Sequence, residues 1–99
     1  MNKSIVLIVE DDPLQRRLIR GNLESEGFVV TDAADQASAV AEMRRLPAEI
    51  ALVDYKLGRE TGLDVIRLLL KENPALAPIM ITGFASVETA VEAIKAGAY

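Results

Sequence analysis

Short apolar runs alternate with amphipathic segments along this chain, and the alternation constrains its fold more than any other feature. Ser4–Val9 and Ile50–Val53 are too short for helices and almost entirely apolar, as in strands that are covered on both faces. Phe28–Thr31 and Pro78–Ile81 are predicted as two further strands. Strands that alternate with helices predict an α/β fold, in which a doubly wound parallel sheet has helices on both faces.

Helix signals fill the segments between these strands. Asp12 and Pro13 are typical of an N-cap and a first helical position, and Gln15 completes the pattern of a capping box. Ser86 is predicted to cap the last helix, and residues 55–61 are predicted to form a polar loop. The first helix has one apolar side, made by Leu14, Leu18, Ile19 and Leu23. In the second helix the residues expected to face inward are Ala37, Val40 and Ala41.

Size and composition exclude several classes of protein. The 99 residues contain neither cysteine nor histidine, so a disulfide framework, a zinc site of the usual kind and a Ser-His couple are all excluded. A net charge of -4 argues against direct nucleic-acid binding by this segment. The apolar runs are too short to span a membrane, and the N-terminus lacks the pattern of a secretory signal. We therefore expect one cytoplasmic domain over residues 1–99.

Acidic residues and a hydroxyl follow the predicted strands. Glu10 and Asp11 come after the first strand, Asp54 after the third and Thr82 after the fourth. Each residue alone is ordinary at the start of a loop. The carboxyl ends of parallel strands lie at one edge of the sheet, however, so these side chains are expected to converge there. Carboxylates that are held together repel each other unless a cation neutralises them, and an all-oxygen site suits Mg²⁺.

A carboxylate, a divalent cation and a hydroxyl are together suited to phosphoryl transfer. Asp54 is the candidate nucleophile, because a carboxylate can attack phosphorus and form an acyl phosphate. Gly83 is a weaker candidate, whose backbone N–H could approach a phosphoryl oxygen.

Four blocks of the chain carry a further pattern: Val9–Asp12, Val53–Gly62, Ile81–Gly83 and Lys95–Tyr99. In their order and approximate spacing they resemble the receiver domains of response regulators in two-component signalling, and the resemblance covers the whole chain. The resemblance implies a flavodoxin-like fold, Asp54 as the phosphoacceptor of a sensor histidine kinase, and Thr82 as a switch residue that binds the phosphoryl group. It also implies a Mg²⁺ site made by Glu10, by Asp11 as the closer ligand, by Asp54 and by the backbone carbonyl of Lys56.

The segments after Thr82 also resemble receivers of activators of the alternative sigma factor, so a C-terminal output domain outside this chain is expected. Leu57-Gly58 stands where the family often has Met-Pro, which predicts a more flexible loop. Receivers continue beyond the position of Tyr99 into a fifth strand and helix, with a lysine that pairs with the phosphate and a switch aromatic. Without them, we expect impaired phosphorylation, an uncovered strand edge and a possible homodimer.

Two other functions are compatible with this sequence. The first is an interaction module that keeps the receiver fold and acts without phosphorylation. The second is a phosphohydrolase with an aspartate nucleophile, which would need a second Asp at position 56, where this chain has Lys56.

Overall fold

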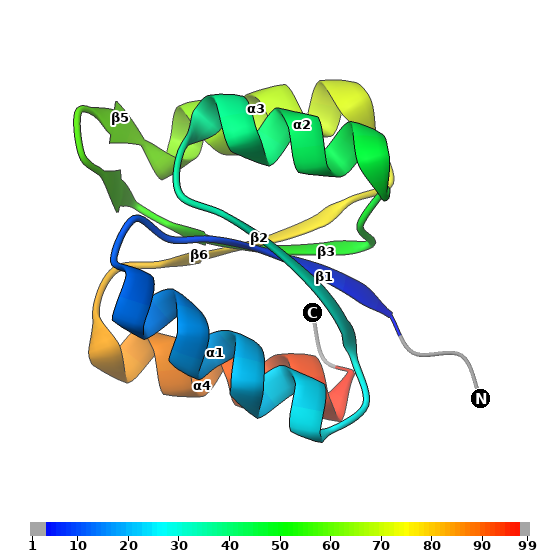
Figure 1. Ribbon diagram of the computed structural model, residues 1–99, viewed down its shortest axis with the longest axis vertical. Coiled ribbons are helices and arrows are strands. Elements are labelled where there is room, and N and C mark those ends of the chain that lie inside the picture. Colours follow the sequence, from blue (N-terminus) through cyan, green and yellow to red (C-terminus); the bar gives the residue numbers. More distant parts are fainter. Residues whose placement is uncertain (1–3, 98–99) are drawn as a thin grey trace.

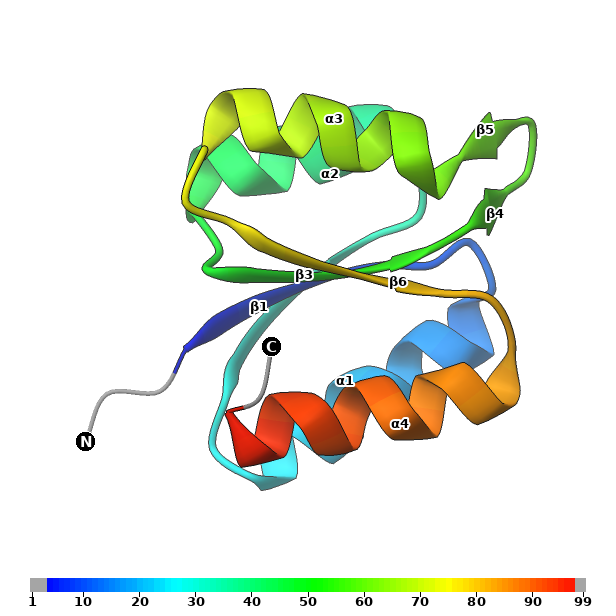
Figure 2. The same ribbon diagram turned by 180° about the vertical axis from the view of Figure 1, so that it is seen from behind.

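The computed structural model describes residues 4–97, which form three layers with a sheet between two layers of helices (Figures 1 and 2). In chain order the elements are β1 (Ile5–Val9), α1 (Pro13–Ser25), β2 (Val29–Ala33), α2 (Gln36–Arg45), β3 (Ile50–Asp54), β4 (Lys56–Leu57), β5 (Glu60–Thr61), α3 (Gly62–Glu72), β6 (Ala77–Ile81) and α4 (Phe84–Ala96). The main sheet is parallel, in the order β2-β1-β3-β6. The predicted doubly wound α/β fold is confirmed.

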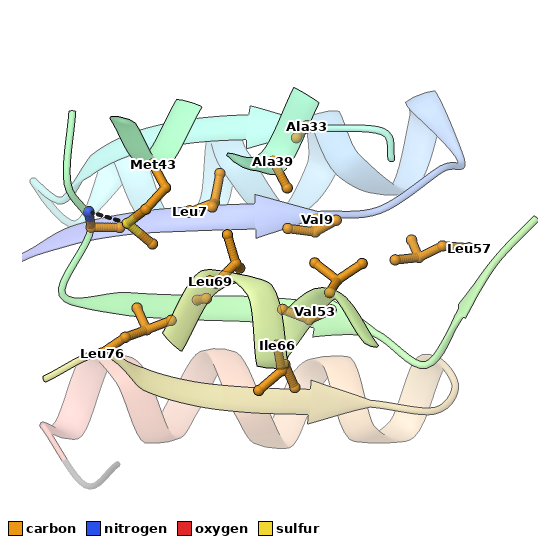
Figure 3. Close-up of a cluster of buried hydrophobic side chains, with 13 residues drawn as sticks. Leu7, Val9, Ala33, Ala39, Met43, Val53, Leu57, Ile66, Leu69 and Leu76 are labelled. Atoms are coloured by element: carbon orange, nitrogen blue, oxygen red, sulfur yellow. Dashed lines mark hydrogen bonds between the residues drawn. The ribbon is translucent and has the colours of Figure 1, made fainter. Parts of the chain in front are cut away.

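The two central strands have no exposed apolar side chain, because helices cover both faces of the sheet. α2 and α3 lie over one face, and α1 and α4 lie side by side over the other (Figures 1 and 2). Leu7 and Val9 point toward α2 and α3 (Figure 3), whereas Val6 and Ile8 belong to the cluster beneath α1 and α4. This period of two explains why β1 is apolar at every position.

Only part of the predicted apolar side of α1 is buried. Ile19 and Leu23 are buried, whereas Leu14 and Leu18 are 63% and 67% exposed. They border a groove of about 480 Å³ between α1 and α4, where Val87 also contributes. The two helices meet closely enough to bury Ile19 but not the leucines on the outer flank.

The predicted inner face of α2 was wrong. Ala37 and Ala41 are exposed and Val40 is half-buried, whereas Ala39 and Met43 are buried. Met43 lies in the cluster beneath α2 and α3, where its sulfur accepts a hydrogen bond of 3.3 Å from the next loop (Figure 3). A helix so rich in alanine offers little apolar contrast between its faces, so packing on the sheet decided which face was buried.

Two local predictions near the strand ends need correction. α4 begins at Phe84 with Gly83 as its N-cap, so Ser86 is the third residue of this helix and not its cap. Residues 55–61 contain the antiparallel pair β4 and β5, because buried Leu57 anchors this segment to the core. Tyr99, at the end of the last block quoted for the receiver resemblance, lies outside the described residues.

Strand β6 forms one edge of the sheet in the described part of the chain. That this edge is uncovered, and that two copies of the chain pair there, both stay predictions. None of the helices within residues 4–97 combines the length and the apolar character that crossing a membrane would require.

The start of α3 presses against the end of β3, and a glycine makes this approach possible. Gly62 is buried, and its N–H donates a 2.7 Å hydrogen bond to the carbonyl oxygen of Tyr55. A Cβ at Gly62 would collide with the backbone carbonyl of Asp54. The backbone that carries Asp54 is therefore held in place by the first residue of the next helix.

We expect Gly62→Ala to lower the free energy of unfolding by about 1–3 kcal/mol, because backbone atoms must shift to admit the methyl group. Gly21→Ala is the matched control, since Gly21 lies inside α1 with nothing within 4 Å of its Cβ position. That control should raise the free energy of unfolding by about 0.5–1 kcal/mol. Urea denaturation of both variants measures the difference. Equal stability of the two variants would contradict the close contact at Gly62.

Candidate functional site

The candidate site lies at the carboxyl ends of the central strands. Glu10 and Asp11 directly follow β1, and Asp54 is the last residue of β3. β1 lies between β2 and β3 in the sheet. The order in which strands are added along the chain therefore reverses at β1. Ligands of open α/β sheets bind outside the strand ends at such a switch point.

The structure brings three predicted carboxylates together. Ligand oxygens of Glu10, Asp11 and Asp54 all lie within 4.8 Å of one another. Glu10 is buried, Asp54 is half-buried and Asp11 is exposed, so the cluster extends from the core to the surface. Among residues 4–97, none of the ion pairs includes any of the three. Their negative charge is thus not neutralised by a neighbouring lysine or arginine in this part of the chain.

Neutral donors orient the carboxylate of Glu10. Its Oε1 accepts a 3.0 Å hydrogen bond from the N–H of Asp12, and its Oε2 accepts one of 3.3 Å from the side-chain amide of Gln15. The guanidinium of Arg16 donates instead to the backbone carbonyl of Glu10, at 2.7 Å. Glu10 is therefore held firmly in position without a countercharge.

The role of Gln15 differs from the predicted one. Sequence reasoning assigned it to a capping box, in which its side chain would reach back to the N-cap backbone. Asp12 does cap α1, accepting from the N–H of Leu14 at 3.0 Å, but its own N–H goes to Glu10. The sequence feature that could have revealed the bond from Gln15 to Glu10 is the short connection between β1 and α1. A connection of this length places the first turn of α1 close to the end of β1.

The pKa of Glu10 is raised from 4.5 to about 8. Burial is the largest cause, followed by hydrogen bonding with Asp54 and by the negative charges of Asp54 and Asp11. The hydrogen bond from the N–H of Asp12 acts in the opposite direction. In the metal-free protein a proton on Glu10 thus offsets part of the repulsion, which is the electrostatic role that a bound cation would take over.

The loop after β3 keeps Asp54 accessible. Asp54 Oδ1 accepts a 3.3 Å hydrogen bond from the N–H of Lys56, whose side chain is exposed. Lys56 then pairs with Thr61 in the small β4–β5 sheet. Thr61 in turn caps α3, its hydroxyl accepting from the N–H of Asp64 at 3.3 Å, a cap that sequence reasoning missed.

Thr82 and Gly83 follow the carboxyl end of β6, the strand that pairs with β3. Ile81 is the register partner of Asp54 in the pair β3–β6, so exposed Thr82 follows directly after that partner. The hydrogen-bond partner of Thr82 in the structure is Ser86. Gly83 has an extended backbone that any residue can adopt, and a Cβ there would meet no atom within 4 Å. The predicted phosphoryl contacts of Thr82 and Gly83 stay predictions.

The donor set fits a hard divalent cation. It consists of oxygen atoms from three carboxylates, with no histidine or cysteine anywhere in the chain. The raised pKa of Glu10 indicates that these groups need positive charge nearby. Carboxylates at the end of a strand, one of them accessible, can hold such an ion and offer an oxygen nucleophile beside it.

Comparisons with known proteins agree with this arrangement. Residues 6–99 match the family model described as the response regulator receiver domain. The nitrogen assimilation regulatory protein NtrX of Azorhizobium caulinodans is 38% identical over 96 residues, which cover 95% of this chain. This chain spans only 21% of that relative and 22% of an alginate biosynthesis regulator from Pseudomonas syringae, so it corresponds to about a fifth of their length.

Two solved structures extend the likeness to three dimensions. A CheY-like receiver domain protein from Methanospirillum hungatei is 33% identical with a TM-score of 0.77, and covers 98% of this chain and 78% of its own. A response regulator from Burkholderia pseudomallei, solved with a phosphorylated aspartic acid, a calcium ion and citrate, is 31% identical with a TM-score of 0.77; the match covers 98% of this chain and 56% of that one. The chain therefore belongs to the response regulator receiver domain family of two-component signalling.

Proposed function

We propose that this chain is a cytoplasmic phosphoacceptor module in which Asp54 takes a phosphoryl group from a sensor histidine kinase. The observation that supports it most directly is the carboxylate cluster, in which Asp54 is partly accessible while Glu10 is buried behind it. The phosphorylated aspartic acid of the Burkholderia relative supports the same chemistry here.

The transfer needs one displacement at phosphorus. A carboxylate oxygen of Asp54 attacks the phosphorus of a phosphohistidine, an O–P bond forms as the P–N bond breaks, and the imidazole nitrogen leaves with the electron pair. The N–H of Lys56, already within 3.3 Å of Asp54 Oδ1, keeps this carboxylate oriented. The hydroxyl of Thr82 then donates a hydrogen bond to an oxygen of the transferred group.

Mg²⁺ would be held by the carboxylates of Glu10, Asp11 and Asp54 and by the backbone carbonyl of Lys56. Asp11 would be a closer ligand than Glu10. When bound, Mg²⁺ supplies positive charge that offsets the charge on the transferred group. Glu10 would then lose its proton, because the cation replaces it as the source of neutralisation.

The longer relatives support a wider role. Since this chain corresponds to about a fifth of regulators such as NtrX, we propose that the module controls an attached output domain that acts on transcription. Phosphorylation would change the surface that the output domain or a second receiver contacts. Nucleic-acid binding is assigned to the output domain, since the receiver itself has a net charge of -4.

Asp54→Asn should abolish labelling by acetyl phosphate and Mg²⁺ in the full-length protein, because an amide is not a nucleophile toward phosphorus. The wild type should gain one phosphate that hydroxylamine removes, as expected for an acyl phosphate. Asp35→Asn is the matched control, since Asp35 is an exposed N-cap of α2 and asparagine caps equally well. Mass spectrometry measures the label. Persistent labelling of Asp54→Asn would refute the assignment of the nucleophile.

In the presence of a chelator, the protein should become less stable as the pH rises from about 5 to 8. Glu10 has a pKa of about 8 when folded against a model value of 4.5, so the folded state binds more protons in this interval. The stabilisation from this group is complete below pH 4.5 and is lost as the pH rises through 8. Urea midpoints across this range measure the decline.

Two further conditions make this pH test specific. Glu10→Gln should remove most of the decline, because glutamine does not titrate. Saturating Mg²⁺ should restore stability most at the alkaline end, where the carboxylates are charged and need a cation. A pH profile that Mg²⁺ and Glu10→Gln both leave unchanged would contradict the proposed metal site.

A further inference from the structure

The hydroxyl of Ser86 is the centre of a small hydrogen-bond network at the start of α4. Ser86 Oγ lies 2.9 Å from the carbonyl oxygen of Gly83 and 2.9 Å from the backbone nitrogen of Thr82. Its third neighbour is the hydroxyl of Thr82, with 3.4 Å between the two oxygens. One side chain in the first turn of α4 thus binds both the backbone and the side chain of Thr82.

Counting protons settles the direction of each bond. A serine hydroxyl has one proton to donate and can accept two hydrogen bonds. The carbonyl oxygen of Gly83 can only accept, and at 2.9 Å it lies nearer to Ser86 Oγ than the Thr82 hydroxyl does. It therefore accepts the hydrogen bond that the Ser86 hydroxyl donates. The N–H of Thr82 can only donate. The remaining bond therefore has the Thr82 hydroxyl as donor and Ser86 as acceptor, which fills the bonding capacity of Ser86.

We infer that Ser86 is a positioning residue that occupies the Thr82 hydroxyl in the resting protein and so competes with a phosphoryl group on Asp54. This inference rests on the proposed function, in which Thr82 donates to that phosphoryl group. A hydroxyl has a single proton, so Thr82 cannot donate to Ser86 and to a phosphoryl oxygen at once. Phosphorylation must therefore break the Thr82–Ser86 side-chain bond.

The same exchange gives phosphorylation a direct effect on α4. Ser86 is the third residue of this helix, and its N-cap Gly83 has no side chain to satisfy the first turn. When Thr82 turns away, Ser86 loses a hydrogen-bond partner in a first turn that has no side-chain cap. Phosphorylation of Asp54 at the end of β3 thereby changes the hydrogen bonds in the first turn of α4. This helix lies on the same face of the sheet as α1 (Figure 2).

The test measures binding of beryllium fluoride, a phosphoryl mimic, by calorimetry in the full-length protein with Mg²⁺. Ser86→Ala should bind it about two- to fivefold more tightly than the wild type, the factor expected for the loss of one competing hydrogen bond of ordinary net strength. Ser86→Thr keeps the hydroxyl and should bind like the wild type. Ser38→Ala is the matched control, since Ser38 is also the third residue of a helix, α2, and binds its own cap Asp35.

A double-mutant cycle separates the effect of the Thr82–Ser86 side-chain hydrogen bond from a general effect on the loop. If Ser86 acts through the Thr82 hydroxyl, Ser86→Ala should have no effect in a Thr82→Ala background. The inference is overturned if Ser86→Ala leaves affinity unchanged or weakens it, or if the same gain persists without the Thr82 hydroxyl. Wild-type protein that binds no beryllium fluoride would instead refute the proposed function, so the two failures are distinguishable.

Discussion

Mutual repulsion among Glu10, Asp11 and Asp54 is the constraint on which the function of this protein depends. The topology of the sheet forces three carboxylates to within 4.8 Å, and none of them has an ion-pair partner within residues 4–97. Protonation of buried Glu10 relieves part of this repulsion, as its raised pKa shows. Because a proton neutralises only one charge, the cluster is a better site for a divalent cation than for a proton.

The surrounding structure holds these groups rigidly without neutralising them. Gln15 and the N–H of Asp12 orient Glu10 with neutral donors, and the close approach of Gly62 fixes the backbone of Asp54. An arginine or lysine in place of Gln15 would satisfy Glu10 permanently and would compete with an incoming cation. Neutral hydrogen bonds provide orientation and preserve the negative charge that the proposed chemistry requires.

Sheet register connects this charge cluster to a surface helix. Asp54 is paired with Ile81, the next residue is Thr82, and Thr82 is bonded to Ser86 in the first turn of α4. The path from the proposed phosphoacceptor to a helix terminus therefore involves two neighbouring strands and the hydroxyls of Thr82 and Ser86. A change in one hydrogen bond at this point is small in energy, which suits a switch that must be reversible.

The sequence by itself determined the four strands of the main sheet and the residues at their ends. Buried central strands need apolar residues on both faces, so Ser4–Val9 and Ile50–Val53 were recognisable as strands. Parallel strands then bring Glu10 and Asp54 to one edge of the sheet. Tertiary packing alone decided the inner faces of α1 and α2, the bond from Gln15 to Glu10, the close contact at Gly62 and the place of Ser86 within α4. The physical reason is that local patterns record period and polarity, whereas these contacts depend on how separate elements dock.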